Sequence, residues 1–376
     1  MDVDILVVGG GLSGLHTAFE LEKGDHDYLL VEARNRLGGR VLTSSYSSNN
    51  DVSNKSDAAF DLGPSWFWPA QTRLEKLAVE LKLNTEIFKQ YSQGSSVFED
   101  AQGNVEKNFY GMSMEGSYRL RGGISQFITR LSQQIPQEKI LSNTPVTDLS
   151  YENDKVTASI MNNGKQEFIR SKRVVLALPP RNALANIQFH PSLSPNRASN
   201  LNNFPTWMAS QAKFVAVYDK PFWREQGFSG DAMSHIGPLR EIHDASTNDV
   251  PERKTRYALF GFVGVDANYR KDNQQQVIEA CVQQLVRLFG EDASSPSHIS
   301  WKDWATEKYT STPEDQLSGG HAQHSLEVVT EWNNQLIWSG TETAEVRNEH
   351  NNGYLEGALE SSMRTLELIK RLKDPA

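Results

Sequence analysis

The stretch SQAKFVAVYDKPFW, residues 210–223, places a lysine inside an apolar segment. Residues 212–218 predict a β-strand, in which successive side chains point to opposite faces. The two faces would carry Phe214, Ala216 and Tyr218 on one side and Lys213, Val215 and Val217 on the other. Both faces are apolar, so we expect a doubly buried strand, and an unpaired buried ammonium is costly. Either Lys213 reaches solvent at the strand's end, or it serves the chemistry of a site.

A second candidate site lies at the start of the chain, where Gly9, Gly11 and Gly14 form the pattern G-x-G-x-x-G. Glycines at this spacing permit a tight turn, let the backbone approach a pyrophosphate and allow a helix to pack closely on a strand. A helix N-terminus after them favours phosphates through its free N–H groups and dipole. Glu32 follows by about 20 residues, the spacing of an acid that holds a ribose hydroxyl. The alternative is a glycine-rich loop without a ligand.

The elements around these glycines occur in the order that a dinucleotide site requires. Residues 3–8 form a short apolar run with β-branched residues, typical of a buried strand. From Leu15 apolar residues recur at helical spacing, and Lys23-Gly24 indicates the end of the helix. Residues 28–31 predict a second strand, which ends just before the acid. This order indicates a Rossmann-like unit far more specifically than the glycines alone.

Beyond this unit, the chain resembles the flavin-containing amine oxidases, a family that includes monoamine oxidases, polyamine oxidases and the histone lysine demethylases of the same fold. The resemblance begins with EARNRLGGR at residues 32–40. Further matching segments are spread over nearly the whole chain: DLGPSW (61–66), RGG (121–123, before a predicted helix), VVLALPP (174–180), SGTETA (339–344) and GYLEGALES (353–361). The resemblance implies FAD as cofactor, oxidation of an amine to an imine, hydrolysis to an aldehyde or ketone, and reoxidation by O₂ with release of hydrogen peroxide.

The resemblance also implies which residues contact the cofactor. Arg40 would be a fixed cation near the pyrophosphate, Val146 would contact the adenine, and Glu342 lies in the segment that holds the pyrophosphate and ribityl chain in relatives. A helix beginning at Gly353 would point its N-terminus at the flavin, where a positive dipole end stabilises the anion formed on reduction. The predicted FAD-binding residues are Gly9, Gly11, Ser13, Gly14, Glu32, Ala33, Arg34, Gly39, Arg40, Gly63, Pro64, Ser65, Trp66, Val146, Gly340, Glu342, Gly353, Tyr354 and Leu355.

Two residues become candidates for catalysis through the same resemblance. In the family, a strand lysine followed by seven residues and then PFW holds a water that bridges to flavin N5. Lys213 is followed by FVAVYDK and then PFW, which favours this role over a lysine that snorkels from an edge strand. We expect desolvation to lower its pKa and make it a neutral or switchable hydrogen-bonding group. Tyr354 matches one aromatic of the cage that faces the flavin, with core packing as the alternative.

The sequence departs from the family pattern between Trp304 and the glycines at 319–320. Monoamine oxidases have a shorter spacing there, then a cysteine that carries the flavin covalently, then a second cage tyrosine. His321 follows the glycines here, so we expect FAD to be bound non-covalently. His321 and Tyr309 are candidates to replace the missing tyrosine. The single cysteine, Cys281, lies on an apolar helical stripe and is expected in the core.

We predict an α/β chain of two domains, a Rossmann-like FAD-binding domain and a substrate domain with a mixed sheet. The FAD-binding domain would comprise residues 1–70, 119–182 and 330–376, and the substrate domain residues 71–118 and 183–329. The stretch between DLGPSW and RGG is short beside that of larger relatives, which predicts a compact substrate domain with a smaller or more open pocket. Amphipathic spacing predicts three helices, with stripes at Leu74, Leu77, Ala78 and Leu81; Val277, Cys281, Leu285 and Leu288; and Leu355, Leu359, Met363 and Leu366.

Two further segments each allow two interpretations. Residues 44–59 are polar and predict a surface loop, with a lid over the site as the alternative. Trp66, Phe67 and Trp68 are candidates for a pocket wall or the flavin's edge, and equally for the core.

Composition and charge exclude several other classes of protein. The 376 residues suffice for two domains, and 38% hydrophobic with 23% charged residues is typical of globular chains. A net charge of −9 without a basic run argues against nucleic acid as a partner. No apolar run reaches transmembrane length, no signal-peptide pattern precedes the first strand, and one cysteine excludes an intrachain disulfide. We therefore expect a cytoplasmic monomer or homodimer without a membrane partner. His321 and His324 lack a third ligand at suitable spacing, so no metal is expected.

Two other functions stay open at this point. A flavin desaturase or dehydrogenase acting on C–C bonds shares the N-terminal unit, so the fold alone does not exclude it. Lys213 before PFW, together with Tyr354, favours an amine as substrate. The incomplete cage also allows an FAD-bound scaffold protein without turnover.

Overall fold

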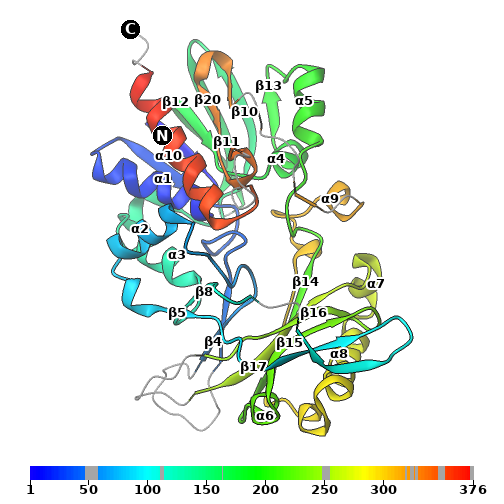
Figure 1. The fold of residues 1–376 in the computed structure, drawn as a ribbon. Helices are drawn as coiled ribbons and strands as arrows, with labels where there is room; N and C mark the ends of the chain where they lie inside the picture. Colours follow the sequence, from blue (N-terminus) through cyan, green and yellow to red (C-terminus); the bar gives the residue numbers. More distant parts are fainter. Residues whose placement is uncertain are drawn as a thin grey trace.

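The computed structural model describes residues 1–46, 58–110, 114–162, 164–247, 255–317, 320–321, 326, 329–345 and 352–372. Two large sheets organise this part of the chain (Figure 1). The nine-stranded sheet lies with α1 and α10 in the upper half of Figure 1, and the seven-stranded sheet lies with α8 in the lower half.

The nine-stranded sheet is built around β1 (Asp2–Val8), which pairs in parallel with β2 and β12. β9 and β20 extend the parallel part on either side. The first half of β12 pairs instead with β11, and β11 with β10, in an antiparallel meander. The bounds are β2 (Tyr28–Val31), β9 (Ile140–Leu141), β10 (Val146–Glu152), β11 (Lys155–Asn162), β12 (Lys165–Leu176), β13 (Gln188–His190), β19 (Thr330–Glu331) and β20 (Leu336–Trp338). The strands predicted at 3–8 and 28–31 are thereby confirmed, and the first three residues of the VVLALPP segment (174–180) form the end of β12.

Side chains on the two faces of β1 enter two different cores. Ile5 and Val7 pack against a layer of four helices, and Leu6 and Val8 pack against the meander. Burial on both faces explains why this parallel strand is almost continuously apolar. The four helices are α1 (Leu12–Lys23), α2 (Thr72–Glu80), α3 (Ser125–Ser132) and α10 (Leu355–Arg371).

The buried face of α10 differs by one position from the predicted stripe. Leu355, Leu359 and Leu366 are buried, but 45% of Met363 is exposed. Each step of four residues overshoots a full helical turn by about 40°, so a row of such steps drifts off the buried face. Ile369 is buried instead, and the prediction for Met363 is wrong.

The seven-stranded sheet has the order β18-β14-β17-β16-β15-β6-β7. All seven residues of β14 (Ala212–Tyr218) are buried, which confirms the predicted strand with two buried faces. β14 pairs antiparallel with both β17 and β18. The other bounds are β6 (Ser95–Glu99), β7 (Val105–Phe109), β15 (Phe228–Ser234), β16 (Leu239–Asp244), β17 (Tyr257–Val263) and β18 (His298–Asp303).

The faces of β14 meet different layers. Phe214 joins a core with α8 (Gln274–Phe289) and α6 (Phe222–Glu225). Cys281 is fully buried in this core, as predicted, and burial raises the pKa of its thiol. Val215, on the opposite face, packs against β4 (Ala58–Asp61) and Trp66. The face that carries Lys213 is therefore covered by the segment that follows the N-terminal nucleotide-binding unit.

The loop predicted at residues 44–59 is shorter in the structure. β3 (Thr43–Tyr46) pairs antiparallel with β4, so both ends of the predicted loop are strand residues. The alternation of polar residues with Tyr46 and Phe60 fits a hairpin with one packed face. Residues 47–57, on which the lid alternative depends, lie outside the described residues.

The predicted domain boundaries can be compared with the two sheets. Leu74 and Leu77 of α2 pack in the helical core of the nine-stranded sheet, although residues 71–118 were predicted to belong to the substrate domain. β13 pairs with β10, and Leu201 of α5 (Pro195–Asn202) packs in the meander's core. We propose that these segments belong with the FAD-binding domain. An amphipathic pattern shows that one helix face is buried, but not against which sheet.

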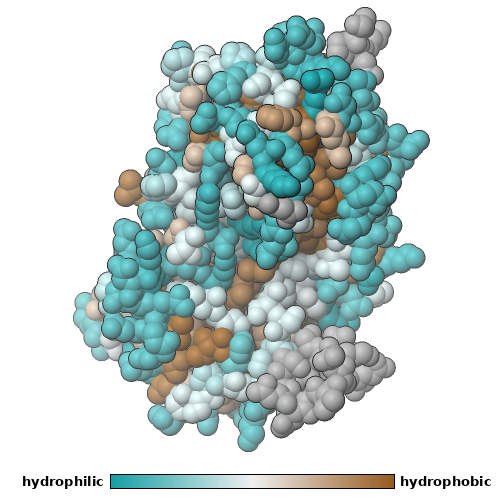
Figure 2. Space-filling view, turned by 180° about the vertical axis from the view of Figure 1, so that it is seen from behind, coloured by the Kyte–Doolittle hydropathy of each residue, from teal (hydrophilic) through white to brown (hydrophobic). Residues whose placement is uncertain are grey.

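The surface is mostly hydrophilic. Figure 2, seen from behind, shows apolar side chains gathered along the middle of this face and at its lower left, with hydrophilic residues over most of the remainder. Within the described ranges, no helix is long and apolar enough to cross a membrane.

Substitution of Gly14 should destabilise the contact between α1 and the glycine turn. A Cβ at Gly14 would lie 1.9 Å from the carbonyl oxygen of Gly9, and backbone atoms cannot swing aside. We expect Gly14→Ala to lower the free energy of unfolding of the cofactor-free protein by about 1–3 kcal/mol, measured by urea titration. Gly11→Ala is the control, because its Cβ would meet nothing within 4 Å. Equal stability of both variants would contradict the prediction.

Candidate active site

A cavity of about 360 Å³ is lined by residues from both sheets and their connections. The predicted residues that line it are Gly9, Gly11, Ser13, Glu32, Arg34, Gly39, Arg40, Gly63, Pro64, Ser65, Trp66, Lys213, Gly340, Glu342, Gly353, Tyr354 and Leu355. Ala33 and Val146 line a smaller adjacent pocket, which shares Gly9, Glu32 and Arg34 with the cavity. Gly14 lines neither, because it is buried against the glycine turn. The structure thus brings together residues that are far apart in the chain.

The first turn of α1 forms one wall of this cavity. Gly11 is the N-cap of α1, and no side chain caps the helix, so its first N–H groups remain available to a ligand. Gly9 has a φ of 107°, a conformation that favours glycine. The N–H of Gly38 donates to the carbonyl oxygen of Gly10 at 2.7 Å, which holds the next loop and Arg40 beside the turn. These features suit a pyrophosphate.

Glu32 is fixed at the end of β2 by backbone donors. One of its carboxylate oxygens accepts the N–H of Gly10 and the other accepts the N–H of Arg34, both at 2.8 Å. Each oxygen keeps a further lone pair, so the carboxylate can also accept ribose hydroxyls. The ribose contact remains a prediction.

Glu342 has a carboxylate oxygen that accepts no hydrogen bond from any described residue. Its Oε1 lies 2.6 Å from Nη2 of Arg40, while its Oε2 has no hydrogen-bond partner within the described part of the chain. Only 1% of Glu342 is exposed, and leaving a buried carboxylate oxygen without a donor is costly. A ligand hydroxyl in the cavity would satisfy it. The residues present therefore fit the ribityl and pyrophosphate parts of FAD.

The N-terminus of α10 forms another wall. Tyr354 is its N-cap, no side chain caps the helix, and Leu355 and Ala358 also line the cavity. Free N–H groups and the positive dipole end therefore adjoin the cavity, as the prediction for this helix requires.

Lys213 lines the same cavity from β14, with 3% of the residue exposed. Its Nζ donates to the carbonyl oxygen of Gly63 at 3.1 Å and to Oγ of Ser65 at 2.6 Å. The ammonium also lies 3.9 Å from the centroid of the Phe260 ring, within cation–π range. Lys213 does not reach bulk solvent, so the first of its two alternatives is wrong.

The surroundings of Lys213 set its protonation. Burial lowers the pKa of Lys213 to about 7; Asp61 opposes this shift and Arg119 adds to it. Asp61 is itself buried, which raises the pKa of its carboxyl, although hydrogen bonds from Thr43 and Ile124 oppose that shift. Lys213 can therefore change charge near neutral pH, in line with the predicted switchable hydrogen-bonding group.

Tyr354 belongs to a stack of aromatic rings. The rings of His321 and Tyr354 are nearly parallel, with centroids 5.3 Å apart, and His321 stacks on Trp207 at 3.6 Å. Trp68 meets Tyr354 edge-on at 6.2 Å. Tyr309 lies 5.6 Å from the Arg34 guanidinium and lines both the cavity and the adjacent pocket that Val146 lines, but no ring contact joins it to Tyr354 among the described residues. Of the two candidates for the missing cage residue, His321 is therefore the one beside Tyr354.

The tryptophan-rich segment divides between site and core. Trp66 and Trp68 line the cavity, whereas Phe67 is fully buried in the helical core. Alternation along an extended segment explains this division. Among the described residues, no group of three or more His, Cys, Asp or Glu is placed to hold a metal, and His324 lies outside them.

Sequence reasoning missed several lining residues. Gln211, Glu241 and Phe262 line the cavity but belong to no motif. Phe262 lies on β17, which pairs with β14, and Glu241 lies on β16, the next strand in the sheet. Only the pairing register places both side chains on the face that carries Lys213. Trp304, which served only as a landmark, lines the cavity and donates from Nε1 to the carbonyl oxygen of Leu62 at 2.9 Å.

The lowered pKa of Lys213 should make stability depend on pH. Below pH 7 both native and unfolded protein hold the proton, and above the ordinary pKa of 10.5 neither does. Between these values the unfolded chain binds more protons, so the free energy of unfolding rises with pH. Lys213→Met removes this contribution. We expect wild type to gain stability relative to the variant between pH 7 and 10.5, measured by urea unfolding of the holoprotein. A difference that does not change with pH would overturn this assignment.

Comparisons with known proteins agree with this geometry. Residues 91–369 match the family model described as flavin containing amine oxidoreductase, and residues 7–81 match the NAD(P)-binding Rossmann-like domain. The chain is 26% identical to a probable flavin-containing monoamine oxidase A of Dictyostelium discoideum, covering 98% of this chain and 97% of that protein. It is 22% identical to a flavin-containing amine oxidase A of Canis lupus familiaris, over 96% of this chain and 84% of that protein.

Solved structures show the same fold. A triple mutant of putrescine oxidase superposes with a TM-score of 0.80 at 20% identity, covering 99% of both chains. Cyclohexylamine oxidase from Brevibacterium oxydans IH-35A gives a TM-score of 0.77 at 19% identity, over 99% of this chain and 100% of that one. With a family model that spans most of its length and a cavity whose unfilled donors and acceptors fit FAD, the chain belongs to the flavin-containing amine oxidoreductases and is an FAD-dependent amine oxidase.

Proposed function

We propose that this enzyme oxidises a small amine beside Lys213 and Tyr354, and that O₂ is the electron acceptor, with hydrogen peroxide as product. FAD, when bound, accepts the hydride that leaves the α-carbon of the amine. The resulting imine hydrolyses to an aldehyde or ketone. The observation that carries this proposal is the buried amino group of Lys213, which faces the cavity from a doubly buried strand.

The chain's own residues have distinct parts in this reaction. Lys213 would hold a water by hydrogen bonding, because Ser65 and Gly63 orient its amino group and its lowered pKa makes a neutral form accessible. Tyr354 and the aromatic rings beside it would orient a neutral amine. The N-terminus of α10 would stabilise the negative charge that develops during reduction.

We also propose that the cofactor is held without a covalent bond. Cys281 is fully buried among apolar side chains of the seven-stranded sheet's core and lines no part of the cavity. Acid precipitation of the holoprotein should therefore leave the flavin in the supernatant, measured by its absorbance. Flavin that stays with the precipitated protein would contradict this proposal.

The substrate class can be tested with the purified holoprotein. We expect some primary or secondary amines to reduce the flavin without oxygen, seen as a loss of its absorbance, and to release peroxide in air. Isoprenoid-like compounds, which would be substrates under the alternative hypothesis of a C–C desaturase, should not reduce the flavin. Bound flavin that no amine reduces would favour a non-catalytic scaffold instead.

The role of Lys213 is tested by Lys213→Met. Reoxidation of the reduced flavin by O₂ should become slower, because the amino group that holds the water is lost. Stopped-flow absorbance after mixing with oxygenated buffer measures this rate. Reoxidation and turnover at the wild-type rate would overturn the assigned role.

Location in the cytoplasm, expected from the single cysteine, remains part of the proposal.

A further inference from the structure

Three side chains form a row across the seven-stranded sheet. Lys213 of β14 lies directly opposite Phe262 of β17, and Phe262 lies opposite Glu241 of β16. Residues opposite one another in antiparallel strands share a face. All three line the cavity. Two strand spacings put the backbones of Lys213 and Glu241 about 10 Å apart.

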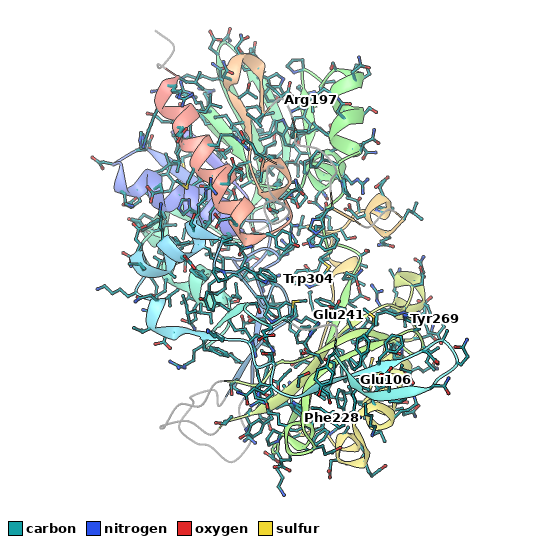
Figure 3. All side chains as sticks on the ribbon, viewed as in Figure 1. Glu106, Arg197, Phe228, Glu241, Tyr269 and Trp304 are labelled. Atoms are coloured by element: carbon teal, nitrogen blue, oxygen red, sulfur yellow. The ribbon has the colours of Figure 1, made fainter. Side chains whose placement is uncertain are left out.

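Among the described lining residues, Glu241 is the carboxylate that lies outside the segments that fit the cofactor. The other carboxylates among the described lining residues are Glu32 and Glu342, which belong to the segments that fit the cofactor. The side chain of Glu241 is 29% exposed, so it can meet a ligand in the cavity. In Figure 3 Glu241 lies nearer to the nine-stranded unit than Glu106 and Phe228 do, on the side where Trp304 also lies.

A buried histidine holds Glu241 in place. Nε2 of His243 lies 3.0 Å from Oε1 of Glu241, and Nδ1 lies 2.7 Å from Oδ1 of Asp231. An imidazole donates to two carboxylates only when it is protonated. Burial opposes the charge, but the hydrogen bonds that the ring donates to both carboxylates outweigh it and raise the pKa of His243. The same contact lowers the pKa of Glu241.

Glu241, His243 and Asp231 together carry a net negative charge, and this charge lies beside the cavity. Asp231 is 1% exposed, and its other oxygen has no partner among the described residues, so the imidazolium is its main counter-charge. Trp66 packs edge-on against the His243 ring, with the ring centroids 5.0 Å apart, and covers that side of the imidazole. One net negative charge remains for the three groups, and Glu241 is the member that lines the cavity.

We propose that Glu241, held by His243 and Asp231, binds a second cationic nitrogen of the substrate, so that short α,ω-diamines are preferred over monoamines of equal length. This inference rests on the proposed oxidation of an amine beside Lys213. The reacting nitrogen would be neutral near Lys213, and the distal nitrogen would remain an ammonium beside Glu241. Phe262 lies between the two and offers an apolar surface to the methylene chain. The distance of about 10 Å between the backbones of Lys213 and Glu241 favours a diamine with a short methylene chain.

Glu241→Gln tests the inference with little risk to the fold, because the amide oxygen can still accept from His243. The test compares a series of α,ω-diamines with matched monoamines, by anaerobic flavin reduction and by titration calorimetry of the anaerobically reduced holoprotein. We expect the diamines to bind about 10- to 100-fold more weakly to the variant, the loss of one hydrogen bond between charged groups. The affinity for monoamines should not change.

Glu106→Gln is the matched control. Glu106 is an exposed glutamate at the far edge of the same sheet, on β7, and it does not line the cavity. Its substitution should leave both ligand classes unaffected. An equal loss for diamines and monoamines in Glu241→Gln, or no loss for either, would overturn the inference while leaving amine oxidation in place. Failure of every amine to reduce wild-type flavin would overturn the proposed function, and the calorimetry would still test diamine binding.

A second variant tests the part of His243 as a positioning residue. Removing His243 alone would leave Asp231 as an unpaired buried charge, so His243→Gln is combined with Asp231→Asn. We expect the KM for diamines to rise while kcat and both constants for monoamines stay near wild type. A fall in kcat for both ligand classes would instead indicate a general structural role and would overturn the positioning role.

Discussion

The amino group of Lys213 is buried on an apolar strand, and much of the site depends on how it is accommodated. It finds partners in Gly63 and Ser65, which belong to the segment after the N-terminal nucleotide-binding unit. This contact ties the seven-stranded sheet to the unit that holds the cofactor. Because desolvation opposes the charge, the same burial lowers the pKa of Lys213 to about 7. One interaction thus connects the two parts of the molecule and prepares the group for chemistry.

Charge is distributed along the row that begins at Lys213. A switchable cation stands at one end and Glu241 at the other, separated by the apolar ring of Phe262. The carboxylate does not stand alone, since the buried pair of His243 and Asp231 holds it. Buried ion pairs of this kind are weak evidence for stability, and their best-supported use is to specify one arrangement. Here the arrangement would define where a second substrate charge is bound.

The sequence predicted the cofactor side well because its constraints are local. Gly9, Gly11 and Glu32 lie within one strand–helix–strand unit, so their spacing along the chain nearly determines their spacing in space. Lys213 was identified because β14 is apolar on both faces, and burying an ammonium group there without a partner is costly. One prediction failed for a local reason, since Met363 satisfied a four-residue repeat that drifts off the buried face of the helix. The pattern of α2 showed that one face is buried but not that this face packs in the core of the nine-stranded sheet.

What the sequence by itself determined is the nucleotide-binding unit, the family, the buried strand and the identity of its lysine. Only the tertiary structure decided which residues surround that lysine. The position of Glu241 follows from the register of three antiparallel strands, and a shift of one residue would turn its side chain to the opposite face. The choice of His321 over Tyr309 beside Tyr354 likewise depends on how the chain after β18 returns to the cavity. Side-chain alternation is local and readable, whereas strand register and loop path arise from contacts between distant segments.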